Sequence, residues 1–237
     1  MSSFGVGELG LNLCYETPGT IGLRRATLDN PAFARDLLGV GDDDRGAPPM
    51  IFIFDPLRTF MEVVERDADG YGRLTISMLD PERSVPLLRY QTGDIVRLLD
   101  GAQVAAVMSR HGVALAGDLS ATLLALKGRE KDGLPNGSHV GVYKDALYAD
   151  HRIAHRLTGA FRLIFSGDRS TMHVQLRASE IPHASLEEGI LHAVAQRLRP
   201  LRLKLWPYAD FPFGMTLDYE RKFPHYVQGE ADTIGLS

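Results

Sequence analysis

One carboxylate in the chain stands in a sequence setting where it could bind a sugar. Residues 90–94 read Tyr-Gln-Thr-Gly-Asp, and apolar residues precede and follow this segment. The pattern predicts a strand that leads into a tight glycine-containing turn, with a second strand leaving the turn. The turn would present Asp94, whose two ionised oxygens can accept hydrogen bonds from a ribose diol. Thr-Gly-Asp also forms ordinary turns, so the five residues alone leave both interpretations open.

A second candidate group is the guanidinium of Arg129. It lies in residues 128–137, which contain glycines, a proline, an Asn-Gly pair and several charges, a composition that predicts a linker between two domains. A guanidinium at such a joint can bind ribose or phosphate oxygens while the neighbouring residue lets the following domain rotate. A plain interdomain loop would have the same composition.

The N-terminal segment places an aromatic ring, glycines and an acid within five residues. Phe4 offers a face for stacking, Gly5 allows close approach of a ligand to the backbone, and Glu8 can bind a divalent cation through oxygen. The alternative is a frayed, glycine-rich terminus.

A histidine pair and a run of aspartates could be metal sites, but for both we favour a structural interpretation. His151 and His155 have a spacing that could hold zinc, but residue 152 is an arginine where a metalloprotease helix carries an acid, so we favour a non-metal role. The three aspartates at 42–44 are typical of a solvated surface loop.

Composition limits the classes of function. The chain has 237 residues, enough for one domain with a proper core or for two small ones, and its net charge of −4 argues against general nucleic-acid binding. The single cysteine, Cys14, excludes an internal disulfide. No apolar run approaches the length needed to span a bilayer, and the first residues do not form a signal peptide. We expect a cytoplasmic protein with no membrane partner.

Turn residues and apolar periodicity predict the helices and strands that position the candidate site residues. Residues 50–99 contain short strands with turn residues between them, which predicts a small antiparallel barrel or curved sheet. Asn30 and Pro31 predict the start of a short helix over 30–38. Residues 102–111 fit either a short helix or an irregular link, and a strand is expected at 123–127.

The second half predicts a small α+β domain of ferredoxin-like order, β-α-β-β-α-β. Its expected strands are 139–142, 161–165, 172–176 and 201–206, and its expected helices are 144–157 and 185–198. The predicted fold class is α+β, with a β-subdomain followed by this ferredoxin-like domain. The predicted divisions are 1–127, a hinge at 128–137, and a mobile domain at 138–237.

Three of these segments, in this order, resemble motifs of the adenylate-forming (AMP-binding) ligases, in particular the phenylacetate–CoA ligase-like branch. They are Phe-Gly-Val-Gly-Glu at 4–8, Tyr-Gln-Thr-Gly-Asp at 90–94 and Gly-Arg-Glu-Lys-Asp at 128–132. The resemblance implies that Asp94 binds the ribose diol and that Arg129 contacts ribose or phosphate. It also implies that Phe4 and Gly5 border the adenine.

The same resemblance assigns Glu8 to Mg²⁺ and Lys131 to the hinge. Lys222 is the candidate catalytic lysine by its position in the C-terminal tail, although the usual Gly-Lys surroundings are absent and a solvated tail lysine is the alternative. The implied reaction couples ATP to a carboxylate substrate, giving an acyl-AMP, and coenzyme A then forms the thioester.

One part of such a ligase is missing from the sequence. The family grips the triphosphate with a Ser/Thr/Gly-rich loop ending in Lys and Gly, and no such stretch occurs among these residues. We therefore expect the C-terminal part of a ligase, inactive alone, working with a separate N-terminal half or a homodimer partner, or a truncated form. The alternative is a non-catalytic nucleotide-binding or protein-interaction module derived from that family.

Overall fold

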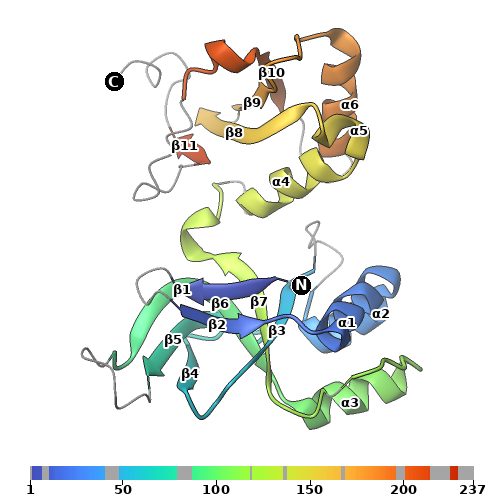
Figure 1. Ribbon diagram of the computed structural model, residues 1–237, viewed down its shortest axis with the longest axis vertical. Coiled ribbons are helices and arrows are strands. Elements are labelled where there is room, and N and C mark those ends of the chain that lie inside the picture. The colour runs from blue at the N-terminus through green and yellow to red at the C-terminus, as the bar shows by residue number, and fades with distance from the viewer. Residues whose placement is uncertain are drawn as a thin grey trace. The chain divides into compact units, whose positions relative to one another are not determined.

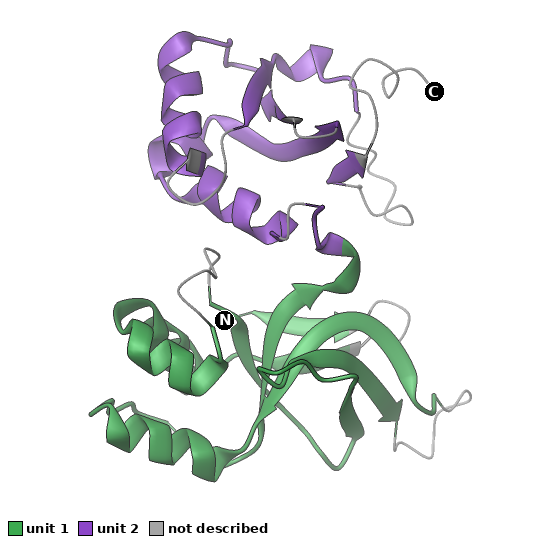
Figure 2. Cartoon of the chain, turned by 180° about the vertical axis from the view of Figure 1, so that it is seen from behind, with its two compact units in different colours: residues 1–131 green, residues 132–237 purple. Residues whose placement is uncertain are grey.

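A computed structural model describes residues 2–6, 11–40, 48–78, 87–117, 119–135, 138–166, 169–195, 201–213 and 225–228. The chain divides into two compact units, unit 1 at Met1–Lys131 and unit 2 at Asp132–Ser237 (Figure 2). Both units combine helices with a sheet, so the predicted α+β class is confirmed. Within the described ranges, no helix is long and apolar enough to cross a bilayer.

Unit 1 is built on a seven-stranded sheet in the order β1-β2-β3-β7-β6-β5-β4, in which every neighbouring pair is antiparallel. The strands are β1 (Ser3–Val6), β2 (Leu11–Tyr15), β3 (Met50–Phe54), β4 (Thr59–Val64), β5 (Gly72–Met78), β6 (Tyr90–Leu99) and β7 (Leu123–Arg129). The antiparallel sheet predicted for residues 50–99 is therefore present, and strands from both sides of that range extend it.

Three capped helices accompany the sheet: α1 (Pro18–Asp29), α2 (Pro31–Leu38) and α3 (Gly101–Arg110). Asn30 caps α2 as predicted, because its side chain accepts a hydrogen bond from the backbone N–H of Phe33. Asp100 caps α3 in the same way, so the segment that the sequence left open is a helix. Helix α1, which begins after a capping box at Thr17, was not predicted.

The two faces of this sheet bury different sets of apolar side chains. One face carries Leu74, Ile76, Val96 and Leu124, all of them fully buried. The opposite face packs against the helices, which contribute Leu23, Phe33, Leu38 and Val104 to a core shared with Ile51 and Leu123. Figure 1 shows α1, α2 and α3 gathered on one side of unit 1. Side chains of β6 are therefore buried in one core or the other, depending on the face of the sheet to which they project.

Unit 2 contains a four-stranded sheet in the order β10-β9-β8-β11. Strands β8 and β9 form the predicted antiparallel hairpin, whereas β10 runs parallel to β9 and β11 runs parallel to β8. The elements are α4 (Val140–Tyr148), α5 (His151–Ala154), β8 (Leu157–Ser166), β9 (Arg169–Leu176), α6 (Ala184–Ala195), β10 (Arg202–Trp206) and β11 (Tyr226–Gln228). The predicted strand near 201–206 and helix near 185–198 are present as β10 and α6.

The first strand of the predicted ferredoxin-like order is wrong. Residues 140–142 begin α4, because the side chain of His139 accepts a hydrogen bond from the backbone N–H of Gly141 and caps the helix. The predicted helix over 144–157 is also divided, since Asp150 caps a second short helix and Leu157 already belongs to β8. Strand β11 was not predicted.

The first turn of α3 lies so close to the chain at residue 120 that only glycine fits at its first position. A Cβ on Gly101 would overlap the carbonyl group of Ser120, which is backbone and cannot move aside cheaply. We expect Gly101→Ala to lower the free energy of unfolding by about 1–3 kcal/mol, measured by urea denaturation.

Gly22→Ala in α1 is the matched control for this substitution. Its added Cβ would meet only the flexible end of the Leu115 side chain, at 3.2 Å, and alanine favours a helix. We expect the free energy of unfolding of this variant to equal that of the parent or to fall only slightly below it. Equal losses in the two variants would contradict the close approach of α3 to residue 120.

Candidate functional site

The structure brings Asp94 and Arg129 together. They are directly opposite each other on the antiparallel strands β6 and β7, and directly opposed residues project to the same face of a sheet. Nε of Arg129 lies 3.4 Å from Oδ1 of Asp94, within ion-pair distance. Asp94 is only 3% exposed, whereas the side chain of Arg129 is 32% exposed. The pair therefore has a buried anionic end and an accessible cationic end.

The Thr-Gly-Asp segment is not the turn between two strands that the sequence predicted. It lies inside the single strand β6, where residues 92–94 face only Leu74 of β5, so β6 bulges at this point. Gly93 has φ +77°, a conformation that costs a side-chain-bearing residue energy and glycine little. Regular pairing resumes on both sides of the bulge, and this is why the chain does not turn back here.

Thr92 stabilises the bulge from within. Its Oγ1 accepts a hydrogen bond from the backbone N–H of Asp94 at 3.1 Å and donates to the carbonyl oxygen of Leu74 at 3.4 Å. The hydroxyl thus replaces ladder bonds that the bulge interrupts, and it fixes the backbone from which the Asp94 side chain projects.

A second irregularity, in β7, decides which residue faces Asp94. Ile95 pairs with Gly128 and Val96 pairs with Leu126, so Lys127 is an extra residue on β7. If pairing continued regularly from Val96 and Leu126, Lys127 would face Ile95 and Gly128 would face Asp94. The β7 bulge therefore aligns Arg129 with Asp94.

Neighbouring charges around the pair are already compensated. Arg73 of β5 lies opposite Ile95 of β6. It forms ion pairs with Glu130 at 2.6 Å and with Glu65 at 2.9 Å. The hydrogen bond that Arg73 donates to Glu130 and the negative charges of Glu130 and Glu65 raise the pKa of Arg73, so its charge is held by acids at the sheet surface. Lys131 lies exposed in the short 3-10 helix Glu130–Asp132 that follows β7.

The other predicted site residues are not assembled around Asp94. Phe4 lies in β1 with its ring 9% exposed and 6.0 Å from the ring centroid of Phe52, within the core. Gly5 is half-buried at an irregularity in the β1–β2 pairing. The sheet order places three strands between β1 and β6. Glu8 and Lys222 lie outside the described residues.

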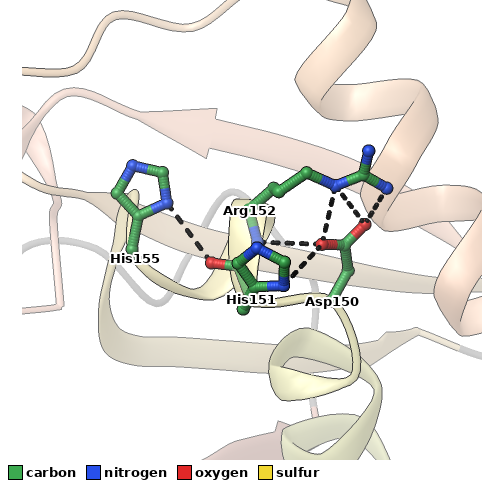
Figure 3. A network of polar contacts seen from close by, with 4 residues as sticks. All are labelled: Asp150, His151, Arg152 and His155. Atoms are coloured by element: carbon green, nitrogen blue, oxygen red, sulfur yellow. Dashed lines mark hydrogen bonds and ion pairs between the residues drawn. The ribbon is translucent and has the colours of Figure 1, made fainter.

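His151 begins α5 and His155 directly follows its last residue, and their polar contacts are made within residues 150–155 (Figure 3). Nδ1 of His155 lies 3.3 Å from the carbonyl oxygen of His151, whose own side chain is 95% exposed. Arg152 binds both carboxylate oxygens of Asp150 and lowers the pKa of that residue to about 2. Among the described residues, no group of three or more His, Cys, Asp or Glu side chains is placed to hold a metal ion.

Sequence reasoning missed a buried polar cluster on the β8–β9–β10 sheet. His173 and Arg162 are directly opposed and each is 7% exposed. Nε1 of Trp206 donates to Nδ1 of His173 at 3.0 Å, and the guanidinium of Arg162 lies 4.9 Å from the ring centroid of Phe213. The available signal was alternation in β9, where His173 and Gln175 occupy every second position between apolar residues.

Burial, together with the positive charges of Lys204 and Arg162, lowers the pKa of His173 to about 4. The imidazole is therefore neutral in the folded protein at physiological pH. Its Nδ1 accepts the Trp206 hydrogen bond, which places the remaining ring proton on Nε2.

No protein family and no curated protein match the sequence. Among solved structures, the anthranilate CoA ligase AuaEII in complex with anthranoyl-AMP aligns with 62% of this chain at 14% identity and a TM-score of 0.37. The apo structure of MbtA from Mycobacterium smegmatis aligns with 63% at 17% identity and a TM-score of 0.26. This chain covers 29% of each of those proteins, and superpositions this loose do not establish a common fold.

The neutral state of His173 predicts a pH dependence of stability. An unfolded chain takes up a proton on this residue near its ordinary pKa of 6.5, and the folded chain does so only near 4. Protonation therefore favours the unfolded chain as pH falls through this window, so stability decreases from pH 6.5 to 4 and then levels. Between about pH 7 and about pH 5 we expect His173 to account for a loss of about 1–2 kcal/mol.

The measurement is urea unfolding of the parent and of His173→Asn at both pH values. Asparagine keeps an acceptor for Trp206 but cannot titrate. The pKa of His225 is also lowered by burial, so both proteins should lose some stability, and the parent should lose more. Parallel pH profiles would show that His173 is not the group responsible.

Proposed function

We propose that Asp94 and Arg129 form part of a nucleotide-binding site, and that the chain is the C-terminal part of an adenylate-forming ligase of the phenylacetate–CoA ligase-like branch. The observation that carries this proposal is the ion pair between the two residues, built by bulges in both β6 and β7. Bulges interrupt backbone pairing, and they are enriched beside functional sites because they re-aim side chains.

The chemistry of the pair suits a nucleoside monophosphate. Arg129 places a positive charge 3.4 Å from Oδ1 of Asp94. A carboxylate has about four acceptor positions, so one group can hold both a guanidinium and a sugar diol. Because Asp94 is 3% exposed, the diol reaches it only when the more exposed Arg129 side chain turns outward, towards phosphate oxygens.

The complete reaction needs parts that lie elsewhere. A substrate carboxylate attacks the α-phosphorus of ATP and releases pyrophosphate, and a thiol then attacks the acyl carbon and releases AMP. In this proposal the thiol is coenzyme A, Lys222 offsets charge in the first step, and Lys131 is the pivot between the steps. Glu8, which lies outside the described residues, would bind Mg²⁺.

A second function is favoured by the absence of a Ser/Thr/Gly-rich loop ending in Lys and Gly from these residues. Without a grip on the triphosphate, the units could serve as a non-catalytic nucleotide-binding or protein-interaction module. The two candidates differ in whether AMP binds through Asp94 and whether pyrophosphate is exchanged when a partner is supplied.

Binding of AMP, measured by calorimetric titration, tests the site. We expect the parent to bind AMP, and Asp94→Asn and Asp94→Ala each to weaken binding at least about tenfold, because a charge-assisted hydrogen bond contributes about 1.5–3 kcal/mol. Asp29→Asn, which changes an exposed aspartate at the end of α1, is the matched control and should bind like the parent.

The sugar contact itself is isolated by a second ligand. The parent should bind 2′,3′-dideoxy-AMP more weakly than AMP, whereas Asp94→Asn should bind the two ligands about equally. AMP affinity that is unchanged in both Asp94 variants would refute the site. Absence of AMP binding to all proteins would favour a module that uses no nucleotide.

The 237 residues alone are expected to show negligible carboxylate-dependent exchange of pyrophosphate into ATP. The physical reason is that nothing in the sequence supplies the loop that grips the β- and γ-phosphates. The assay uses radiolabelled pyrophosphate with a panel of carboxylic acids, and an intact adenylate-forming ligase serves as the positive control. Clear exchange that depends on an acid would overturn the expectation of inactivity.

A further inference from the structure

A cavity of about 280 Å³ lies in unit 1 between α2, α3 and β6. Leu37, Leu99 and Val104 form apolar parts of its wall, and Asp36, Arg97 and Arg110 contribute charged groups. Neither Asp94 nor Arg129 lines it, so it is separate from the nucleotide site proposed above. Pockets with apolar walls and a few convergent polar groups are the usual form of small-molecule sites.

Arg97 is seated in a slot made by two glycines. A Cβ on Gly39, the residue that ends α2, would come within 3.2 Å of Nη1 of Arg97, and a Cβ on Gly70 would come within 3.4 Å of its Nε. Both glycines have positive φ, at +66° and +82°. The chain thus holds the guanidinium against bare backbone, which restricts its motion before any ligand arrives.

The charged side chains that line the cavity carry one more positive than negative charge. Oδ2 of Asp36 lies 3.0 Å from Nη1 of Arg110 and 2.9 Å from Nε2 of His111. These hydrogen bonds lower the pKa of Asp36, whose negative charge is thereby engaged. Arg97 has no ion pair of this kind with any residue in the described ranges. One positive charge is therefore left beside an apolar wall.

We propose that this cavity binds a small organic carboxylate with an apolar body, held by Arg97 and packed against Leu37, Leu99 and Val104. A guanidinium binds a carboxylate with two parallel hydrogen bonds, and the apolar wall gains from covering a hydrocarbon chain. A single uncompensated positive charge matches a monoanion better than a doubly charged phosphate. The volume accommodates a body of about six carbon atoms.

Hexanoate is the probe and 1-hexanol is its neutral counterpart. Each is titrated into the ¹⁵N-labelled full chain, with NMR reporting the amide shifts and calorimetry reporting the affinity. Hexanoate should shift amides of α2 and α3 and bind more tightly than 1-hexanol. Arg97→Gln should weaken hexanoate about tenfold to a hundredfold and leave 1-hexanol unchanged. Arg58→Gln, an exposed arginine in the turn before β4, is the matched control and should bind hexanoate like the parent.

A second pair of variants tests the cavity without touching the charge. Ala106 lines the cavity and Ala105 beside it does not, and both are exposed on α3. Ala106→Trp should abolish binding of both probes, and Ala105→Trp should leave binding intact. Thermal unfolding verifies that each variant is folded. If Arg97→Gln unfolds, Arg97→Lys replaces it: lysine keeps the charge but cannot make the two parallel hydrogen bonds, so this variant should bind hexanoate more weakly than the parent and leave 1-hexanol unchanged.

Three results would overturn the proposal: hexanoate that causes no shifts at α2 and α3, equal affinity for hexanoate and 1-hexanol in the parent, or Ala106→Trp binding like the parent. Hexanoate shifts confined to surface lysines and arginines elsewhere would likewise show that the cavity has no preference for this anion.

Discussion

The antiparallel pairing of β6 with β7 is the constraint on which unit 1 depends. Val96 and Leu124 of these strands belong to one core, and Leu99 and Leu123 belong to the core beneath the helices. One register therefore fixes which residues enter each core. Both strands keep this register although each contains a bulge, and the bulges occur together near the Asp94–Arg129 end of the pair. Irregular backbone is thus concentrated where the buried carboxylate lies.

Three arginines on this sheet show how the surroundings decide what a guanidinium can do. Arg73 is held by two acids at the surface, which engages its charge. Arg129 is paired with the buried carboxylate of Asp94. Arg97 packs beside Gly39 and Gly70 and lines a neighbouring cavity. The same residue type therefore has three different chemical roles within one sheet.

Unit 2 has a different distribution of polar groups. One face of its sheet packs against α4 and α6 through apolar side chains such as Phe161, Leu163 and Val174. The other face buries Arg162 and His173, and Trp206 and Phe213 provide hydrogen bonding and ring contacts to them. Burial of a polar pair costs free energy unless it finds partners, so this face specifies its packing more narrowly than an apolar one would.

Local signals determined much of the fold. Asn30 before Pro31 located α2, and apolar runs separated by turn residues located the strands of residues 50–99 and the β8–β9 hairpin, because these features act within a few residues. Local patterns failed where a side chain reached a backbone group unexpectedly, as His139 does at the start of α4.

The sequence also singled out Asp94 and Arg129 by type and setting, but their convergence was a matter of tertiary structure. Which residue of β7 faces Asp94 depends on one extra residue in that strand, and the Arg97 slot depends on two glycines far apart in the chain. Register and long-range packing arise from the summed burial of many side chains. No short stretch of sequence contains that sum, and only the folded chain could decide it.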